Sequence, residues 1–394
     1  MSVTKLELRT ALGPVYRDVL PYQPRDCTPE EIPVIDLKPM FSSELSERKK
    51  ISSAIKAAAI NNGFFYVKNH GISPEIIVRC KSQVLNFMRQ PLETKDRIRS
   101  HKYSKYFNGY LGRRRAQISP SETADVRESF TFRYSPELDP DHPQDISEIP
   151  ADVRPWIRGE DFVWEGTKHL PNFKKDLVAY WSECLRLARR LVRMFALSLD
   201  LGEDYWDEKV TYPGAEYVSR NVSVNIWPAN KRIWHSGVFN YYPTRTQEEI
   251  RQEFVGLGSH TDLQLFTLLW QDSVGGLQVL TREGQWIKAP PIEGTLVVNI
   301  GDYMMRLCND IYKSTVHRVT NESTQERVSM PFFFGLNFNC VEGVVPSCTS
   351  ESNPAKYEPI SCGCQMRFKM EAEEFVKKEA KRSMAPSAVV VAGQ

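Results

Sequence analysis

The chain has 394 residues, of which 41% are hydrophobic and 25% charged, and 51 basic against 49 acidic side chains leave a formal net charge of +2. This near balance gives no electrostatic reason to expect a nucleic acid or an anionic membrane as a partner. No apolar run approaches the roughly 18 residues needed to span a bilayer, and the N-terminus lacks the apolar stretch of a secretory signal. We therefore expect a soluble, cytoplasmic globular protein.

The eight cysteines are irregularly spaced, which is typical of reduced thiols rather than of a disulfide framework. Four of them crowd one region, namely Cys340, Cys348, Cys362 and Cys364. Their C-x7-C-x13-C-x-C spacing matches no common zinc-site pattern, and no histidine lies among them. Incidental loop cysteines are therefore favoured over a structural zinc site.

The N-terminal half is expected to alternate short strands with helices. After a polar, proline-bearing arm (1–30), the predicted elements are a strand in "IPVIDL" (32–37), a helix in "SELSERKKISSAIKAAAINNG" that Gly63 ends, a strand in "FFYVKNHGI" (64–72) and a helix over 74–91. Residues 101–165 are rich in Pro, Arg, Ser and Tyr with weak periodicity, which favours a lid or a substrate loop. The clearest amphipathic helix, over 173–201, should pack against a sheet.

After about residue 215 the chain becomes rich in short β segments separated by Gly, Asp and Asn. The seven predicted strands lie in "EYVSRNVSVNIWP", "RIWHSGVFNYYP", "LQLFTLLWQD", "GLQVLTREGQWIKAPP", "TLVVNIGDYMMRL", "KSTVHRVTN" and "ERVSMPFFFGLNF". They indicate a double-sheet antiparallel barrel or sandwich with helices bracing its outside. A charged helix over 366–382 should follow. We thus divide the chain into the arm, a mostly helical region (31–214), a β core (215–340) and a C-terminal loop, helix and tail (341–394).

His260 and Asp262 stand two residues apart in "GLGSHTDLQLFTLLW", where a strand would point both side chains to one face. An imidazole and a carboxylate suit a divalent metal, and His317 is the later histidine that a neighbouring strand could add. Two histidines and one carboxylate form the facial triad that leaves three coordination positions open. The alternative is an ordinary histidine–carboxylate pair in the core. Five further histidines show that the residue type occurs without such a pattern: His70, His101, His142, His169 and His235.

Two more pairs of polar residues share strand faces downstream and upstream of the histidines. Arg327 and Ser329 offer an arginine fork and a hydroxyl, which together make a two-point receptor for a carboxylate. Asn240 and Tyr242 in "FNYYP" can both hydrogen-bond to one small ligand. Taken alone, "FNYYP" also reads as an ordinary aromatic strand that ends at a proline turn.

These motifs resemble those of a known family. "HTD" at 260–262, "VGGLQVL" at 274–280, "PPIEGTLVVNIGD" at 290–302, "KSTVHRV" at 313–319 and "RVSMPFFF" at 327–334 are similar to the Fe(II)/2-oxoglutarate-dependent dioxygenases related to isopenicillin N synthase. "IPVIDL" and "NNGFFYVKNHGI" resemble the N-terminal region of the same family. The likeness covers most of residues 30–340 and implies a mainly β fold with flanking helices, whose core is a distorted double-stranded β-helix (a cupin-like jelly roll).

The resemblance also implies roles for individual residues. His260, Asp262 and His317 would bind the iron, Arg327 and Ser329 the distal carboxylate of 2-oxoglutarate, and Tyr242 with Asn240 would contact this co-substrate. The implied cofactors are Fe(II), 2-oxoglutarate and O2, with ascorbate as a stimulant.

The implied activity is the conversion of 2-oxoglutarate and O2 into succinate and CO2, coupled to hydroxylation, desaturation or ring formation or rearrangement of a small organic molecule. A place in specialised (secondary) metabolite biosynthesis rests on the resemblance alone. One alternative is an Fe(II) oxidase of the same family that uses no 2-oxoglutarate, as isopenicillin N synthase does. A remote alternative is a jelly roll that binds a metal or ligand without turnover.

Residues that meet the substrate are predicted from strand alternation and loop composition. Alternation from Arg327 and Ser329 places Pro331, Phe333 and Gly335 on the same face, so Phe333 is a candidate pocket wall or else a core aromatic. The segment "YSKYFNGYLGRRRAQISP" carries Arg113, Arg114 and Arg115, which could grip an acidic or phenolic substrate. A solvated basic loop is the alternative for these arginines.

Overall fold

The computed structural model describes residues 3–10, 13–213, 237–251, 255–320 and 323–363. Two predicted features therefore lie outside the described residues: the strand in "EYVSRNVSVNIWP" and the helix over 366–382. The first part of "RIWHSGVFNYYP", including His235, and Cys364 lie outside them too. No helix in the described ranges is both long and apolar enough to cross a membrane.

The larger of the two main sheets has eight strands. In sheet order they are β4 (Val34–Asp36), β5 (Phe64–Lys68), β13 (Thr295–Ile300), β10 (Phe266–Gln271), β15 (Arg327–Phe334), β8 (Gly237–Tyr242), β7 (Glu128–Phe132) and β6 (Gly109–Leu111). The predicted strands at 32–37 and 64–72 are confirmed as β4 and β5. Strands β6 and β7 fall within 101–165, where no strand was predicted, so the expectation of a wholly irregular segment was wrong.

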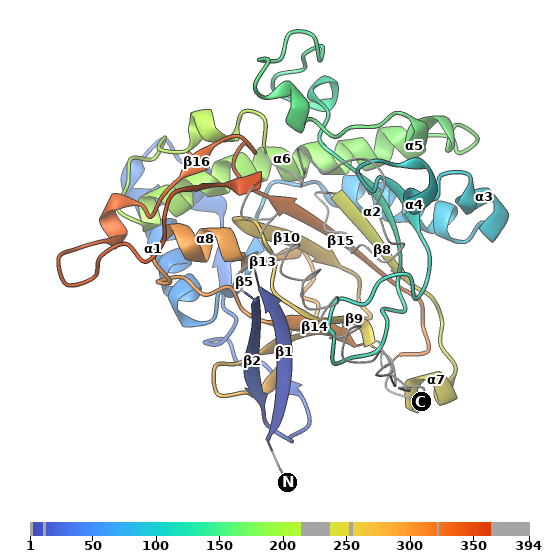
Figure 1. The fold of residues 1–394 in the computed structure, drawn as a ribbon, viewed down its shortest axis with the longest axis horizontal. Coiled ribbons are helices and arrows are strands. Elements are labelled where there is room, and N and C mark those ends of the chain that lie inside the picture. Colours follow the sequence, from blue (N-terminus) through green and yellow to red (C-terminus); the bar gives the residue numbers. More distant parts are fainter. Residues whose placement is uncertain (1–2, 11–12, 214–236, 252–254, 321–322, 364–394) are drawn as a thin grey trace, which may run out of the picture.

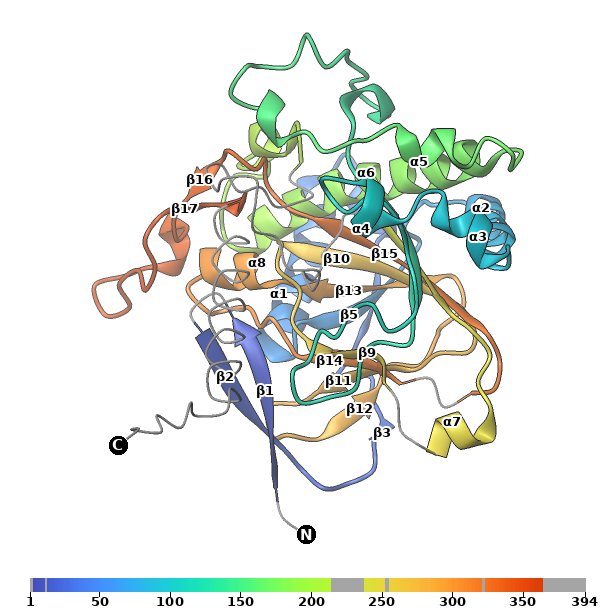
Figure 2. The same cartoon turned by 45° about the vertical axis from the view of Figure 1, so that its right-hand side comes forward.

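The smaller sheet has five strands and faces the larger one (Figure 2). In sheet order they are β3 (Arg25–Asp26), β12 (Trp286–Lys288), β11 (Leu277–Leu280), β14 (His317–Thr320) and β9 (Val255–His260). A buried apolar cluster joins Phe64 and Val297 of the larger sheet to Val279 and Ile287 of the smaller one. The two facing, mostly antiparallel sheets match the predicted double-sheet core.

Helices cover the outer face of the larger sheet (Figure 1). The helices are α1 (Leu45–Asn61), α2 (Pro74–Met88), α3 (Leu92–Asp96), α4 (Ser100–Tyr103), α5 (Phe162–Glu165), α6 (Phe173–Ser198), α7 (Gln247–Arg251) and α8 (Asp302–Leu307). The long α6 packs on β15 and β10: Tyr180 donates a hydrogen bond to the Met330 carbonyl at 3.2 Å, and the rings of Phe195 and Phe266 lie 5.0 Å apart. The predicted helices over 43–63, 74–91 and 173–201 are confirmed as α1, α2 and α6.

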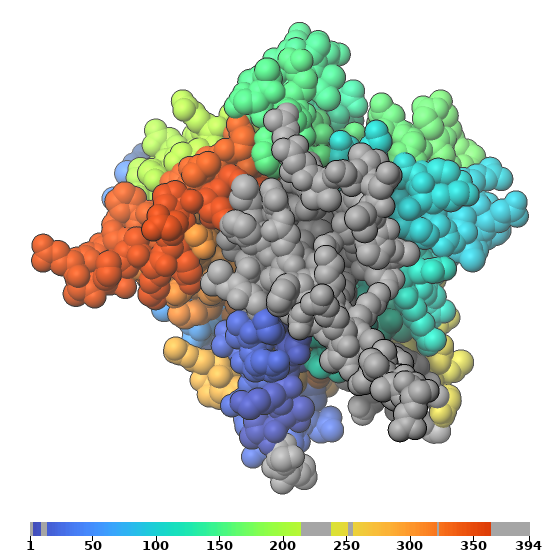
Figure 3. Space-filling model, in the orientation of Figure 1, coloured from blue at the N-terminus to red at the C-terminus, as the bar shows by residue number. Residues whose placement is uncertain are grey.

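The predicted N-terminal arm contains a β hairpin, β1 (Thr4–Thr10) with β2 (Gly13–Val19). Leu6 and Leu8 of the hairpin pack against Leu280, Trp286 and Val316 of the smaller-sheet region. The hairpin lies in the dark blue part of the face in Figure 3, and the orange-to-red segment that precedes residue 364 lies to its upper left. That segment includes a second small pair, β16 (Val341–Glu342) with β17 (Ile360–Ser361).

A buried ion pair fastens the α2–α3 region to the strand β7. The Lys95 ammonium donates to Glu128 Oε2 at 2.6 Å and to the Met88 carbonyl at 2.9 Å, and the Tyr110 hydroxyl donates to the same carboxylate at 2.7 Å. Lys95 and Glu128 are 6% and 7% exposed, so solvent screens the pair little.

We expect the Lys95→Met substitution to destabilise the fold by about 3 kcal/mol, because it leaves the Glu128 carboxylate buried without its cation. Urea unfolding followed by circular dichroism measures the change. The matched control is Lys50→Met, which removes an exposed pair with Glu47 on α1 and should cost less than about 0.5 kcal/mol. Equal midpoints for the two variants would show that the buried pair contributes no more than a surface one.

Candidate functional site

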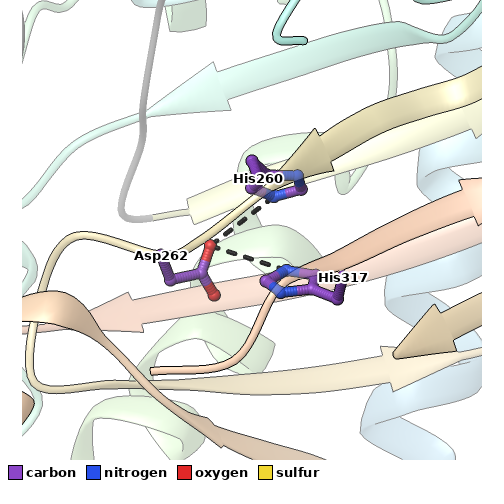
Figure 4. Close-up of side chains that lie close together, drawn as sticks. All are labelled: His260, Asp262 and His317. Carbon is purple, nitrogen blue, oxygen red and sulfur yellow. Dashed lines mark ion pairs between the residues drawn. The ribbon is translucent and has the colours of Figure 1, made fainter. Parts of the chain in front are cut away.

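Three potential metal ligands converge between the two sheets. His317 at the start of β14 is the cross-strand partner of His260 at the end of β9. The Nε2 atoms of His260 and His317 lie 3.7 and 3.8 Å from Asp262 Oδ1 (Figure 4). One ligand atom from each residue lies within 4.8 Å of the others, and this is the only such group of three found in the described ranges.

Asp262 reaches this point by a route that differs from the prediction. Strand β9 ends at His260, so the two residues do not alternate along one strand, and that part of the prediction was wrong. The chain turns instead, and the Asp302 amide donates to the Asp262 carbonyl at 2.8 Å. Gly301 makes this close approach possible, since a Cβ there would lie 2.2 Å from the Gln264 carbonyl oxygen.

Neighbouring groups orient each of the three side chains. The Nδ1 atoms of His260 and His317 lie 2.7 and 3.1 Å from the carbonyls of Gly258 and Thr315. A carbonyl only accepts, so both Nδ1 atoms donate to the backbone and the Nε2 atoms are the ones directed at Asp262.

The two oxygens of the Asp262 carboxylate have different surroundings. Its Oδ2 accepts hydrogen bonds from the Thr267 hydroxyl and, at 2.7 Å, from the Asn299 amide. Its Oδ1 is buried and has no hydrogen-bond partner among the described residues. Two imidazole nitrogens and one anionic oxygen that face one another fit a divalent iron ion, which would give Oδ1 its partner.

The predicted carboxylate receptor lies on the facing wall, on the larger sheet. Strand register pairs Arg327 with Tyr242 and Ser329 with Asn240. Arg327 is fully buried, and its Nη2 atom makes a long 3.4 Å contact with Gln271. Within the part of the chain that the structure describes, its Nε and Nη1 atoms have no partner, and neither has the Tyr242 hydroxyl, whose ring lies 4.6 Å from the guanidinium carbon. A buried cation with open donors fits an anionic ligand.

All seven predicted metal and co-substrate residues line one cavity with about 580 Å³ of space free of protein atoms. Its remaining walls are mostly apolar: Ile118, Val238, Leu257, Leu269, Leu277, Val319, Pro331 and Phe333. The structure therefore places Phe333 in the wall, as the strand alternation predicts, whereas Gly335 is not among the lining residues.

The predicted loop arginines do not join the cavity. Arg113, Arg114 and Arg115 are exposed and absent from its lining, which matches the alternative of a solvated basic loop. The same loop instead contributes Ile118, and Arg127 lines the cavity just before β7 begins.

Three polar residues of the cavity were missed from the sequence: Arg127, Thr267 and Asn299. A signal for the first existed, because "ESFTF" alternates polar and aromatic residues as a strand does. Thr267 and Asn299 stand in strands that were predicted, yet nothing in a single sequence indicates that they reach Asp262.

Comparisons with known proteins agree with this geometry. The model of the 2OG-Fe(II) oxygenase superfamily matches residues 233–336, and the model "non-haem dioxygenase in morphine synthesis N-terminal" matches residues 32–155. The "2-oxoglutarate-Fe(II) type oxidoreductase ppzC" of Metarhizium majus is 42% identical over 363 residues, which cover 91% of each chain. The chain belongs to the 2OG-Fe(II) oxygenase superfamily.

Solved structures of similar proteins show the same fold with ligands bound. A full-length Neurospora crassa protein in complex with alpha-KG (2-oxoglutarate) superposes with a TM-score of 0.68 at 26% identity, over 89% of this chain and 100% of that one. The same Neurospora protein with alpha-KG and thymine gives a TM-score of 0.66, over 87% and 97% of the two chains at 26% identity. JOX2 in complex with 2OG, Fe and JA gives 0.62 at 26% identity, over 87% and 86%.

The family, the double-stranded β-helix core and the enzyme class predicted from the sequence are thereby confirmed. The protein is an Fe(II)/2-oxoglutarate-dependent oxygenase that uses O2 and acts on a small molecule, and a 2-oxoglutarate-independent oxidase is not favoured.

We expect the Asn299→Ala substitution to weaken Fe(II) binding about 10- to 100-fold, because it removes a hydrogen bond that orients the Asp262 carboxylate. Anaerobic titration calorimetry with Fe(II) measures the affinity. Asn339→Ala is the matched control, since that amide donates to Asp152 and is not among the residues that line the cavity. An unchanged affinity in Asn299→Ala would show that Thr267 alone suffices to orient the carboxylate.

Proposed function

We propose that His260, Asp262 and His317 hold the catalytic Fe(II) of this oxygenase. The observation that carries the proposal is the buried Asp262 Oδ1, which faces both Nε2 atoms and accepts no hydrogen bond from any residue that the structure describes. All three side chains line the cavity in which co-substrate, O2 and substrate must meet, and two histidines with one carboxylate would leave coordination positions of the metal free for them.

We further propose that Arg327, Ser329 and Tyr242 bind the distal carboxylate of 2-oxoglutarate, and that Asn240 contacts the same molecule. No carboxylate of the described residues pairs with the Arg327 guanidinium, and its open Nε and Nη1 atoms are charged donors to which an anionic oxygen can bind. A dianionic co-substrate would offset both this charge and the excess charge of Fe(II) over Asp262.

The substrate we propose is a small organic molecule of mainly apolar surface. The apolar part of the cavity lining includes Val238, Leu257, Leu277 and Phe333, and the polar lining residues other than Arg127 belong to the iron and co-substrate sites or orient the Asp262 carboxylate. The matching N-terminal model is named for dioxygenases of morphine synthesis, which supports a role in specialised metabolite biosynthesis.

The protein contributes to the reaction by positioning the reactants and by excluding water. When bound, Fe(II) with 2-oxoglutarate and O2 supplies the oxidising chemistry that consumes a substrate C–H bond. The backbone carbonyls at Gly258 and Thr315 keep both imidazoles in the ligating tautomer, and Arg327 fixes the far end of the co-substrate. The apolar wall holds the substrate with a C–H bond toward the metal and keeps bulk water out.

We expect the purified protein with Fe(II), ascorbate and 2-oxoglutarate to form succinate and CO2, slowly without substrate and faster with it. His317→Ala should lower succinate formation at least 100-fold, because it removes a metal ligand. His101→Ala is the control, since that histidine is exposed and outside the cavity, and it should retain normal rates. Succinate formation by His317→Ala at the unsubstituted rate would refute the proposed iron site.

We expect the Arg327→Met substitution to raise the dissociation constant for 2-oxoglutarate about 100-fold, which corresponds to about 3 kcal/mol for a buried charged pair. Arg327→Lys should recover part of this loss, since a lysine keeps the charge but not the fork. Anaerobic calorimetry with the Fe(II)-loaded protein measures both constants, and Arg113→Met on the exposed loop serves as control. Unchanged affinity in Arg327→Met would assign the co-substrate carboxylate to another residue.

A further inference from the structure

A second arginine of the cavity, Arg127, has no role in the sites described so far. It directly precedes β7, lines the cavity and is 7% exposed. It differs from Arg327 in its surroundings, because the carboxylate of Asp125 lies 4.0 Å from its Nε atom. The charge of Arg127 is thus balanced within the protein, and a role through hydrogen bonding fits better than the capture of an anion.

Arg127 is hydrogen-bonded to Asn240, one of the proposed co-substrate residues. Nη1 of Arg127 donates to the Asn240 side-chain oxygen. A guanidinium has donors only, so the amide must present its oxygen to Arg127 and its Nδ2 hydrogens elsewhere. The hydrogen bond from the guanidinium therefore fixes which way the amide points.

The strand order places Asn240 where its amide can serve the co-substrate. On the central strand β8, Asn240 pairs with Ser129 of β7 on one side and with Ser329 of β15 on the other. None of the described residues accepts a hydrogen bond from Nδ2, and Asn240 lines the cavity. Its two N–H donors are therefore available to a ligand, and a carboxylate oxygen of 2-oxoglutarate is the acceptor that the proposed function provides.

Arg127 is itself held by the strand that carries an iron ligand. Asp125 Oδ1 accepts hydrogen bonds from the amides of Gly258 at 3.2 Å and Ile118 at 3.4 Å. The carbonyl of the same Gly258 lies 2.7 Å from His260 Nδ1. Gly258 of β9 thus holds two groups. Its amide binds the Asp125 carboxylate that faces Arg127, and its carbonyl orients the metal ligand His260.

Building on the co-substrate site proposed above, we propose that Arg127 is a positioning residue for 2-oxoglutarate. It locks the Asn240 amide with its donors toward the cavity. Without Arg127 the amide can rotate by half a turn and direct its oxygen at the co-substrate carboxylate, where the two acceptors repel each other.

A double-mutant cycle tests whether Arg127 acts through Asn240. The variants are Arg127→Met, Asn240→Ala and the two combined, and the measurement is the dissociation constant of 2-oxoglutarate for the Fe(II)-loaded protein under anaerobic conditions. We expect Arg127→Met and Asn240→Ala each to weaken binding about tenfold, as the loss of one hydrogen bond to a charged group predicts. The combined variant should bind no more weakly than Asn240→Ala alone. If the two tenfold losses multiply, so that the combined variant binds 2-oxoglutarate about 100-fold more weakly, then Arg127 acts independently of Asn240 and the proposal is overturned.

Rescue by a second donor separates positioning from simple support of the fold. Arg127→Lys keeps a side chain with donors only, so its 2-oxoglutarate affinity should stay within about threefold of the unsubstituted protein. In turnover, Arg127→Met should raise the KM for 2-oxoglutarate about tenfold with kcat changed less than about twofold. A loss in kcat with an unchanged KM, or an Arg127→Lys variant as weak as Arg127→Met, would overturn the proposal.

The same titrations distinguish failure of this proposal from failure of the proposed co-substrate site. If Arg327→Met weakens 2-oxoglutarate binding while Asn240→Ala and Arg127→Met do not, the proposed binding of the co-substrate by Arg327 stands and the positioning role of Arg127 is refuted. If Arg327→Met has no effect either, the co-substrate site itself is misplaced. Fe(II) affinity and the thermal midpoint of each variant show that the fold and metal site persist.

Discussion

The site depends on buried charged atoms that are left without a partner by the described residues. Asp262 Oδ1 and two nitrogens of Arg327 have no hydrogen bond to these residues, which costs free energy that the rest of the fold must offset. Each charged group is restrained from the side that faces away from the site. Thr267 and Asn299 hold the second oxygen of Asp262, and Gln271 makes a long contact with Arg327. The open atoms are thereby directed at the place where a metal and an anion would satisfy them.

The two sheets divide this work between them. The smaller sheet supplies both histidines through the direct pairing of β14 with β9, whereas the larger sheet supplies the anion receptor through the pairing of β15 with β8. Register is fixed on β15 because both of its faces are used. Arg327 and Ser329 face the cavity, and Val328 and Met330 join the core cluster beneath the helices. A slip of one residue would bury the arginine under α6 and turn the valine toward the co-substrate site.

Much of this site could be predicted because its residues repeat at short spacings. Arg327 with Ser329 and Asn240 with Tyr242 alternate along single strands, so the sequence alone shows that each pair shares a face. The prediction that Asp262 lies beside His260 is correct, but its reason was wrong, because Asp262 follows strand β9 and is not part of it. What could not be predicted depends on pairings between distant segments. Strand β7 lies between β6 and β8, and β8 follows it in the chain by more than a hundred residues. The alternation in "ESFTF" indicates a strand, but only the pairing with β8 brings Arg127 to the cavity.

The loop between β6 and β7 shows why a weakly periodic segment need not be a lid. A lid opens at low free-energy cost and therefore has few hydrogen bonds to the body of the protein. This loop is tied to β9 instead: Glu122 accepts hydrogen bonds from the amide and hydroxyl of Ser259, and Asp125 accepts one from the Gly258 amide. Those bonds end one and two residues before His260. Opening the loop would loosen a metal ligand and release the support of Arg127 together. The segment is therefore a fixed wall that couples the metal ligands on one sheet to the co-substrate residues on the other.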